Sequence, residues 1–132
     1  MAKKKQIPGL PRPTDAELEL LQILWADGKL TVRQVHEQLP KTTSYNTTLT
    51  ILQRMVEKGL VIRDESQRSH VYAAATAAEA TQRQLLRHLL KSAFQGNAAR
   101  LVRQALSEDR ATDDELAELH TLVEEMQRRT EE

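Results

Sequence analysis

The stretch that decides the fold is Ser44-Tyr-Asn-Thr-Thr-Leu-Thr-Ile-Leu-Gln-Arg-Met-Val-Glu-Lys58. In an α-helix each residue turns about 100° from the last, so this stretch places two kinds of side chain on opposite faces. One face carries Tyr45, Leu49, Leu52 and Val56, and the other carries Thr47, Thr50, Arg54 and Lys58. A row of hydroxyl, guanidinium and ammonium groups suits phosphate oxygens and base edges. An ordinary solvated helix face explains the same row, so the stretch alone leaves both interpretations open.

The residues before this stretch predict two more helices. Thr14-Asp-Ala-Glu17 has the spacing of a capping box and begins a helix that Asp27-Gly28 closes. A second box, Thr31-Val-Arg-Gln34, begins a short helix that Pro40 ends, four residues before the N-cap Ser44. A helix, a short turn and a helix predict a helix-turn-helix, whose second helix lies in a DNA major groove.

The residues after Lys58 predict a hairpin. Gly59 suits the left-handed residue that ends a helix, and the runs 60–63 and 70–73 are rich in β-formers around a polar tip. A hairpin directly after a helix-turn-helix makes a winged helix with a two-stranded wing. Arg68 near the tip reaches a minor groove or a phosphate in this interpretation. A solvated loop cation accounts for Arg68 equally well.

The remaining residues predict three amphipathic helices. In the last of them the apolar residues follow at spacings of three, four and three, which is the seam of a coiled coil. Three short helices cannot bury wide apolar stripes alone, so we expect association with a second copy. The alternative is a monomeric cap that folds back on the winged helix. The residues expected at the dimer contact are Leu86, Leu89, Leu90, Leu116, Leu119, Val123 and Met126.

Composition supports a mainly α-helical protein in three parts. Helix formers dominate the 132 residues, aromatic residues make up 3%, and only four Gly and four Pro interrupt the chain. We expect a flexible basic arm at 1–13, a winged-helix DNA-binding domain at 14–75 and a helical dimerisation domain at 76–132. The net charge is zero, but residues 1–75 hold 11 basic against 8 acidic residues and the rest hold 8 against 11. This modest asymmetry has the direction expected of a DNA-binding front and an association module behind it.

Several classes of protein lack support in the sequence. No apolar run is long enough for a membrane span and no signal peptide is recognisable, so we expect a cytoplasmic protein without a membrane partner. The absence of Cys excludes disulfides and thiolate metal sites. No phosphate loop or His-Glu-x-x-His run is present and the four histidines are scattered, so we expect no enzyme, metal site or cofactor.

Four motifs resemble the penicillinase-repressor (BlaI/MecI-type) family of bacterial transcriptional regulators. They are Glu17-Leu-Glu-Leu-Leu-Gln-Ile-Leu-Trp25, Thr31-Val-Arg-Gln-Val-His-Glu37, Tyr45-Asn-Thr-Thr-Leu-Thr50 and Leu52-Gln-Arg-Met-Val-Glu-Lys-Gly-Leu-Val61. The resemblance runs from about Thr14 to Met126. It implies an N-terminal winged helix, a C-terminal dimerisation domain, and a homodimer that occupies a two-fold operator and blocks transcription. It also implies that residues at the positions of Thr47, Thr50 and Arg54 lie against DNA.

The sequence departs from the family in two places. For family members that control β-lactam resistance, the resemblance implies inactivation by a regulatory protease, which cuts an Asn-Phe bond in the dimerisation domain. The aligned region 101–106 has no such pair, and Ala93 precedes the only Phe, Phe94. Copper-responsive relatives are similar in fold but bind metal through Cys-x-Cys motifs, which a chain without Cys cannot do.

The sequence thus predicts a DNA-binding transcriptional regulator, a repressor that binds a palindromic operator as a homodimer. Its partners are a double-stranded DNA operator, a second copy and, by resemblance, a regulatory protease. The alternative is a winged helix that contacts only proteins, which would leave the polar face of the central helix without a purpose. The residues expected to contact DNA are Asn46, Thr47, Thr50, Arg54, Lys58 and Arg68.

Overall fold

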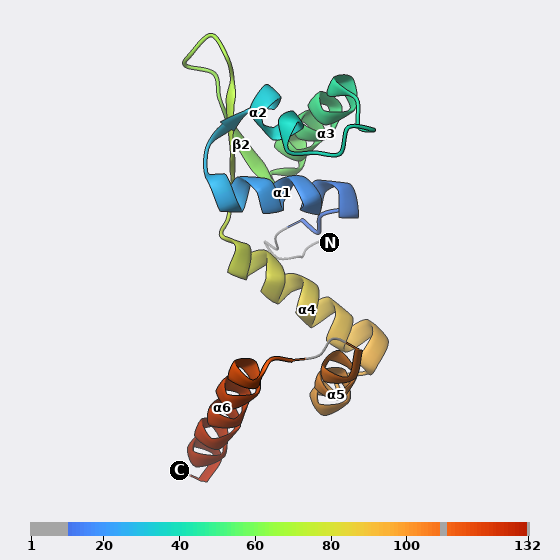
Figure 1. Cartoon of the computed structure of the whole chain (residues 1–132), viewed down its shortest axis with the longest axis vertical. Helices are drawn as coiled ribbons and strands as arrows, with labels where there is room; N and C mark the ends of the chain where they lie inside the picture. The colour runs from blue at the N-terminus through green and yellow to red at the C-terminus, as the bar shows by residue number, and fades with distance from the viewer. Residues whose placement is uncertain (1–10, 109–110, 132) are drawn as a thin grey trace, which may run out of the picture. The chain divides into compact units, whose positions relative to one another are not determined.

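The computed structural model describes residues 11–108 and 111–131, and Figure 1 shows the elements along the chain. The first elements are α1 (Asp15–Asp27), β1 (Leu30–Thr31), α2 (Val32–Glu37), α3 (Tyr45–Lys58), β2 (Val61–Asp64) and β3 (Val71–Ala74). They are followed by α4 (Ala78–Phe94), α5 (Ala98–Glu108) and α6 (Asp113–Glu131). The chain divides into a first compact unit, up to Arg87, and a second unit from His88 onward. The boundary lies inside α4, whereas the sequence placed it ahead of that helix. Most of the basic arm expected at 1–13 lies outside the described residues.

Local capping signals fix the helix starts where the sequence predicted them. The side chains of Thr14 and Thr31 accept hydrogen bonds from the backbone three residues on, and the side chains of Glu17 and Gln34 reach back to complete both boxes. Ser44 caps α3 through the backbone N–H of Thr47, with 3.0 Å between the two atoms. The helix-turn-helix is therefore set by short-range hydrogen bonds before any packing is considered.

The wing is present, and the sheet is larger than predicted. β2 and β3 form the expected antiparallel hairpin, with Val61 opposite Ala74 and Asp64 opposite Val71. β1 adds a third strand on the other side of β3, where Leu30 lies opposite Tyr72. A two-residue strand is too short to show the apolar–polar alternation of a β-strand, so the sequence did not reveal it.

The core of the first unit lies between α1, α2, α3 and the sheet. Its largest fully buried side chains include Leu20, Leu21, Leu24, Val35, Leu52, Met55 and Tyr72. The sequence placed Tyr45 on the inward face of α3, but its side chain is 46% exposed. Thr48, Leu52 and Met55 are the buried residues of α3, so the inward face is rotated towards Met55 relative to the prediction. Tyr45 sits at its edge.

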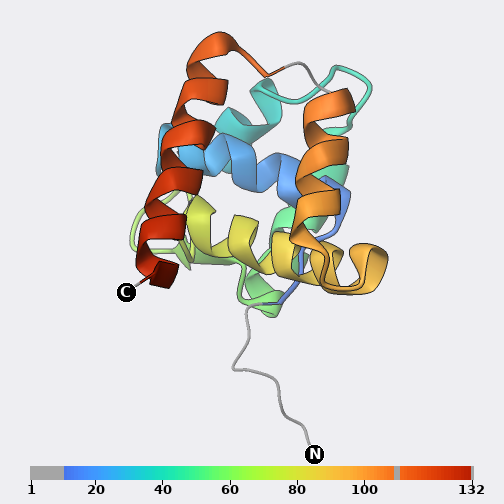
Figure 2. The ribbon, with the colours of Figure 1, turned by 90° about the horizontal axis from the view of Figure 1, so that it is seen from below.

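The second unit buries much less. Figure 2 shows α6, in red, as one continuous straight helix, and none of its residues is buried. α4 ends at Phe94 and is followed by Gln95 and Gly96, both of which have positive φ, and α5 begins directly after Asn97. No helix within the described residues is long and apolar enough to cross a membrane.

Candidate nucleic-acid interface

Four of the six predicted DNA contacts come together on one side of α3. The side chains of Asn46, Thr47, Thr50 and Arg54 are all exposed. Together with Ala16 and Ile51 they line a shallow hollow of about 420 Å³. We call these four side chains the donor face. They lie over the first three turns of the second helix of the helix-turn-helix, which is the part that enters a major groove in such proteins.

The hydroxyl of Thr47 is oriented by the residue that caps the helix. Ser44 Oγ accepts from the backbone N–H of Thr47 and donates to Thr47 Oγ1, with 2.8 Å between the two oxygens. Because Thr47 Oγ1 accepts from Ser44, its own hydrogen is available to an acceptor outside the helix. Phosphate oxygens, purine N7, guanine O6 and thymine O4 are acceptors of this kind. The capping serine therefore prepares Thr47 to donate.

Two residues that the sequence analysis missed hold the start of α3 to α2. The buried hydroxyl of Thr48 donates to Ser44 O at 3.2 Å and lies 3.0 Å from His36 Nδ1. The Thr48 hydroxyl therefore joins the ring of His36 on α2 to the backbone at the start of α3. The ring also meets Tyr45 edge-on, with 5.5 Å between ring centroids. The burial of Thr48 could have been predicted from the helical wheel, because Thr48 falls between the apolar residues Leu52 and Met55.

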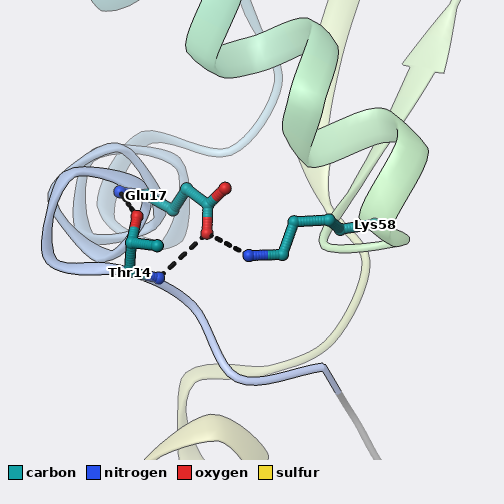
Figure 3. A network of polar contacts seen from close by, with 3 residues as sticks. All are labelled: Thr14, Glu17 and Lys58. Atoms are coloured by element: carbon teal, nitrogen blue, oxygen red, sulfur yellow. Dashed lines mark hydrogen bonds and ion pairs between the residues drawn. The ribbon is translucent and has the colours of Figure 1, made fainter.

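Lys58 is not brought together with the donor face. Its ammonium lies 2.6 Å from Oε1 of Glu17, a carboxylate that is completely buried at the start of α1. Figure 3 shows the same oxygen accepting from the backbone N–H of Thr14, at 2.9 Å. Burial raises the pKa of Glu17, but hydrogen bonds from Lys58 and Thr14 and the charge of Lys58 outweigh burial and lower the pKa below 4.5. Glu17 is therefore held as a carboxylate.

Arg68 is exposed on the wing and lies near a second group of basic side chains. With Arg33, Ser69 and His70 it lines a hollow of about 340 Å³ that also borders the start of α3 at Tyr45. Arg33 and His70 were not among the DNA contacts predicted from the sequence. Arg33 was recognisable as an exposed cation on the helix before the turn. His70 could not be recognised from the sequence, because only the strand pairing of the wing brings it beside Arg33 and Arg68.

The predicted dimer contacts are exposed apolar side chains for the most part. Leu86, Leu89, Leu116, Val123 and Met126 are about half exposed, whereas Leu90 and Leu119 are partly buried. Three residues that the prediction omitted are exposed in the same way, namely Val102, Leu106 and Leu122. Residues of α5 and α6 line a hollow of about 720 Å³, in which Leu106, Leu119 and Leu122 are the large apolar side chains.

Comparison with known proteins identifies relatives over nearly the whole chain. The sequence model of the penicillinase repressor family matches residues 13–125. The penicillinase repressor of Bacillus licheniformis is 27% identical over 126 residues, which cover 93% of this chain and 98% of that protein. The transcriptional regulator BlaI of Mycobacterium tuberculosis is 40% identical over 67 residues, and the match spans 48% of this chain and 49% of that regulator. The solution structure of monomeric Bacillus licheniformis BlaI in complex with the blaP half-operator has a TM-score of 0.48 and 27% identity, and the match covers 54% of this chain and 89% of that one.

Proposed function

Because this chain belongs to the penicillinase repressor family, we propose that it is a DNA-binding transcriptional repressor that reads its operator with the donor face of α3. One observation carries the proposal. Asn46, Thr47, Thr50 and Arg54 gather on the exposed side of the second helix of a helix-turn-helix. Membership in a family of repressors also confirms the expectation that the protein is not an enzyme. We propose that it acts in the cytoplasm, where a bacterial repressor meets its operator.

The chemistry of the donor face suits a major groove. Arg54 has the fork of donors that binds guanine O6 and N7 together, and Asn46 can pair with adenine in the same bidentate way. Thr47 and Thr50 offer hydroxyl donors to base edges or phosphates. Arg68, with Arg33 and His70, forms a separate basic group suited to the phosphate backbone beside the wing.

We further propose that the repressor is a homodimer formed through its C-terminal helices. The exposed apolar side chains of α6 support this, because they need a cover that the other described residues of the second unit do not provide. Charge supports it as well. If two α6 helices pair antiparallel, Leu116 meets Met126 of the second copy and Leu119 meets Val123. This register sets the acidic first turn of each helix beside Arg128 and Arg129 of the other.

A symmetric dimer would bind an operator that has two-fold symmetry. Two copies related by a two-fold axis cover half-sites separated by about one or two turns of duplex, roughly 10 bp each. A regulatory protease has weaker support as a partner. α5 contains no Asn-Phe bond, so a protease would have to recognise another bond in this region.

The test begins with selection of a preferred duplex from a random-sequence library by the full-length protein. Affinity for that duplex is then measured by fluorescence anisotropy over a range of salt concentrations. We expect Arg54→Ala to weaken binding by about 1–3 kcal/mol and to relax preference at one base pair. Arg83→Ala is the matched control, because it removes an exposed arginine from α4, outside the donor face.

The outcomes separate DNA reading from the protein-only alternative. A protein that binds DNA loses affinity steeply with salt, because phosphate contacts release counterions. Selection of no duplex, or full affinity in a variant with both Thr50 and Arg54 replaced by Ala, would rule out the donor face.

A further inference from the structure

A buried carboxylate links the beginning of α1 to the end of α3. Glu17 is completely buried, and its Oε1 accepts from the backbone N–H of Thr14 and from the ammonium of Lys58. Thr14 and Glu17 stand at the start of α1, whereas Lys58 is the last residue of α3, 41 positions away from Glu17. Figure 3 shows both donors converging on one oxygen of the carboxylate.

Helix capping does not explain why this carboxylate is buried. The boxes that begin α2 and α6 use Gln34 and Glu115 in the same position, and both of those side chains are exposed. A capping box therefore works at the surface. Glu17 differs in being buried and in having an ammonium from another helix, and its Oε2 has no hydrogen-bond partner among the described residues. Lys58 is thus the cation that stabilises this buried charge.

The contact fixes the position of the donor face. α3 has 14 residues, so its length is about 20 Å, and its backbone hydrogen bonds make it move as one body. Thr48 and His36 hold its first turn to α2, whereas Lys58 holds its last turn to α1. Releasing the last turn lets the helix shift along or about its axis. Arg54, one turn before Lys58, would be displaced most.

We infer that the ion pair between Glu17 and Lys58 positions the recognition helix, and that Lys58 acts through this contact and not by binding phosphate. This inference rests on the proposed function. Lys58 is a predicted DNA contact whose ammonium is paired with a buried carboxylate, and only 30% of its side chain is exposed. Glu17 and Lys58 are positioning residues, and the base-reading residues are those of the donor face.

The two roles of Lys58 predict opposite effects of changing its partner. If Lys58 binds phosphate, Glu17→Gln removes a competing anion, frees the ammonium and strengthens DNA binding. If the pair positions α3, Glu17→Gln and Lys58→Met remove the same link and weaken binding equally. The salt dependence differs too, because a lysine on phosphate contributes about 0.9 to the slope of log K against log salt. A positioning lysine contributes nothing to that slope.

The experiment uses the full-length protein and the duplex that it selects from a random-sequence library. Affinities are measured over a range of salt for the wild type, Glu17→Gln, Lys58→Met, the double variant and Lys58→Arg. We expect each single variant to bind roughly tenfold more weakly, the size of one weakened base contact. We expect the slope of log K against log salt to stay the same in each variant. The double variant should bind DNA no more weakly than either single variant, because each single substitution already breaks the same ion pair. Lys58→Arg should bind with the affinity of the wild type, since a guanidinium can donate to both oxygens of Glu17.

Loss of stability needs a separate control. Trp25→Phe removes the hydrogen bond from Trp25 Nε1 to Thr76 O and so destabilises the first unit away from α3. All affinities are compared at a temperature where circular dichroism shows each variant folded, and Trp25→Phe should bind as the wild type does. A wild type that selects no duplex overturns the proposed function. With a wild type that binds, tighter binding by Glu17→Gln, or a slope reduced by about 0.9 in Lys58→Met, overturns the positioning role.

Discussion

α1 and α6 both begin with a capping box, but the two helices lie in different environments. Each starts with a threonine whose hydroxyl accepts from the backbone of a glutamate three residues on, while the glutamate reaches back to the threonine N–H. In α1 that glutamate is buried and joined to Lys58, and three leucines of the helix are in the core. In α6 the glutamate is exposed and no residue is buried.

The difference between these helices shows what local sequence can and cannot determine. A capping box fixes where a helix begins, because all its hydrogen bonds span three residues. It does not determine what the helix packs against. α1 is covered by the other elements of the first unit, whereas the apolar side of α6 has the composition of a core face and lacks a cover among the described residues of the second unit. The proposed dimer would give α6 what α1 already has.

The largest effect is expected when the apolar side of α6 is made charged. Replacing both Leu119 and Val123 by Asp would bury two carboxylates from each copy in the proposed dimer contact, which should destabilise the dimer by at least about 4 kcal/mol. Sedimentation velocity should then show monomers at concentrations where the wild type is dimeric. Glu124→Gln, on the same helix beside His120, is the control and should leave the dimer intact. A charged variant that remains dimeric would mean that another surface makes the contact.

The next largest effect concerns the two capping glutamates. Glu17→Ala removes a buried charge, its hydrogen bonds and its packing, so we expect the free energy of unfolding of the first unit to fall by about 3 kcal/mol. Glu115→Ala removes an exposed capping interaction and should lower stability by about 0.5 kcal/mol. Urea unfolding measures the first change through Trp25 fluorescence and the second through helical circular dichroism. Equal effects would contradict the distinction between the two helices.

A third prediction uses pH. The folded structure lowers the pKa of Glu17 below 4.5, so its contribution to stability is fully present above that value and is lost as pH falls through the lower, folded value. The stability difference between wild type and Glu17→Gln should therefore be constant near neutral pH and shrink below pH 4.5. Urea unfolding at a series of pH values measures this. A difference that grows in acid would mean that the carboxylate is destabilised in the fold.

The smallest difference is expected between the two capping threonines. Thr14→Ala and Thr112→Ala each remove a capping hydroxyl, and both should lower stability by about 1 kcal/mol. Because the bonds are local and alike, the two values should agree although the glutamate variants do not. The same two unfolding signals measure them, with Thr121→Ser as a control within α6. A much larger effect of Thr14→Ala would show that its hydroxyl, and not only Glu17, contributes to packing.

The sequence predicted the features that depend on short-range bonds. The capping boxes at Thr14 and Thr31, the N-cap Ser44 and the left-handed Gly59 were all recognisable, and with them the winged helix. The four residues of the donor face could be selected on a helical wheel because each is defined by its angle alone. Their role in reading DNA remains a prediction.

Features that depend on how helices meet could not be predicted. The inward face of α3 is set by the positions of α1 and α2 against it, which brings Thr48 and Met55 inside and leaves Tyr45 exposed. Lys58 fitted the polar row equally well, and only the place of α1 explains why it turns to Glu17. β1 is visible only once β3 lies beside it.

The donor face has a consequence for how such repressors diverge. Its four side chains are exposed, and the core of α3 consists of other residues on the same helix. With the proposed role, substitutions at these positions are expected to change base preference with little effect on folding, since surface changes usually alter stability by no more than about 0.5 kcal/mol. One scaffold can in this way acquire new operators by changing a few exposed side chains. The same positions are the natural ones to randomise when repressors that ignore one another's operators are wanted.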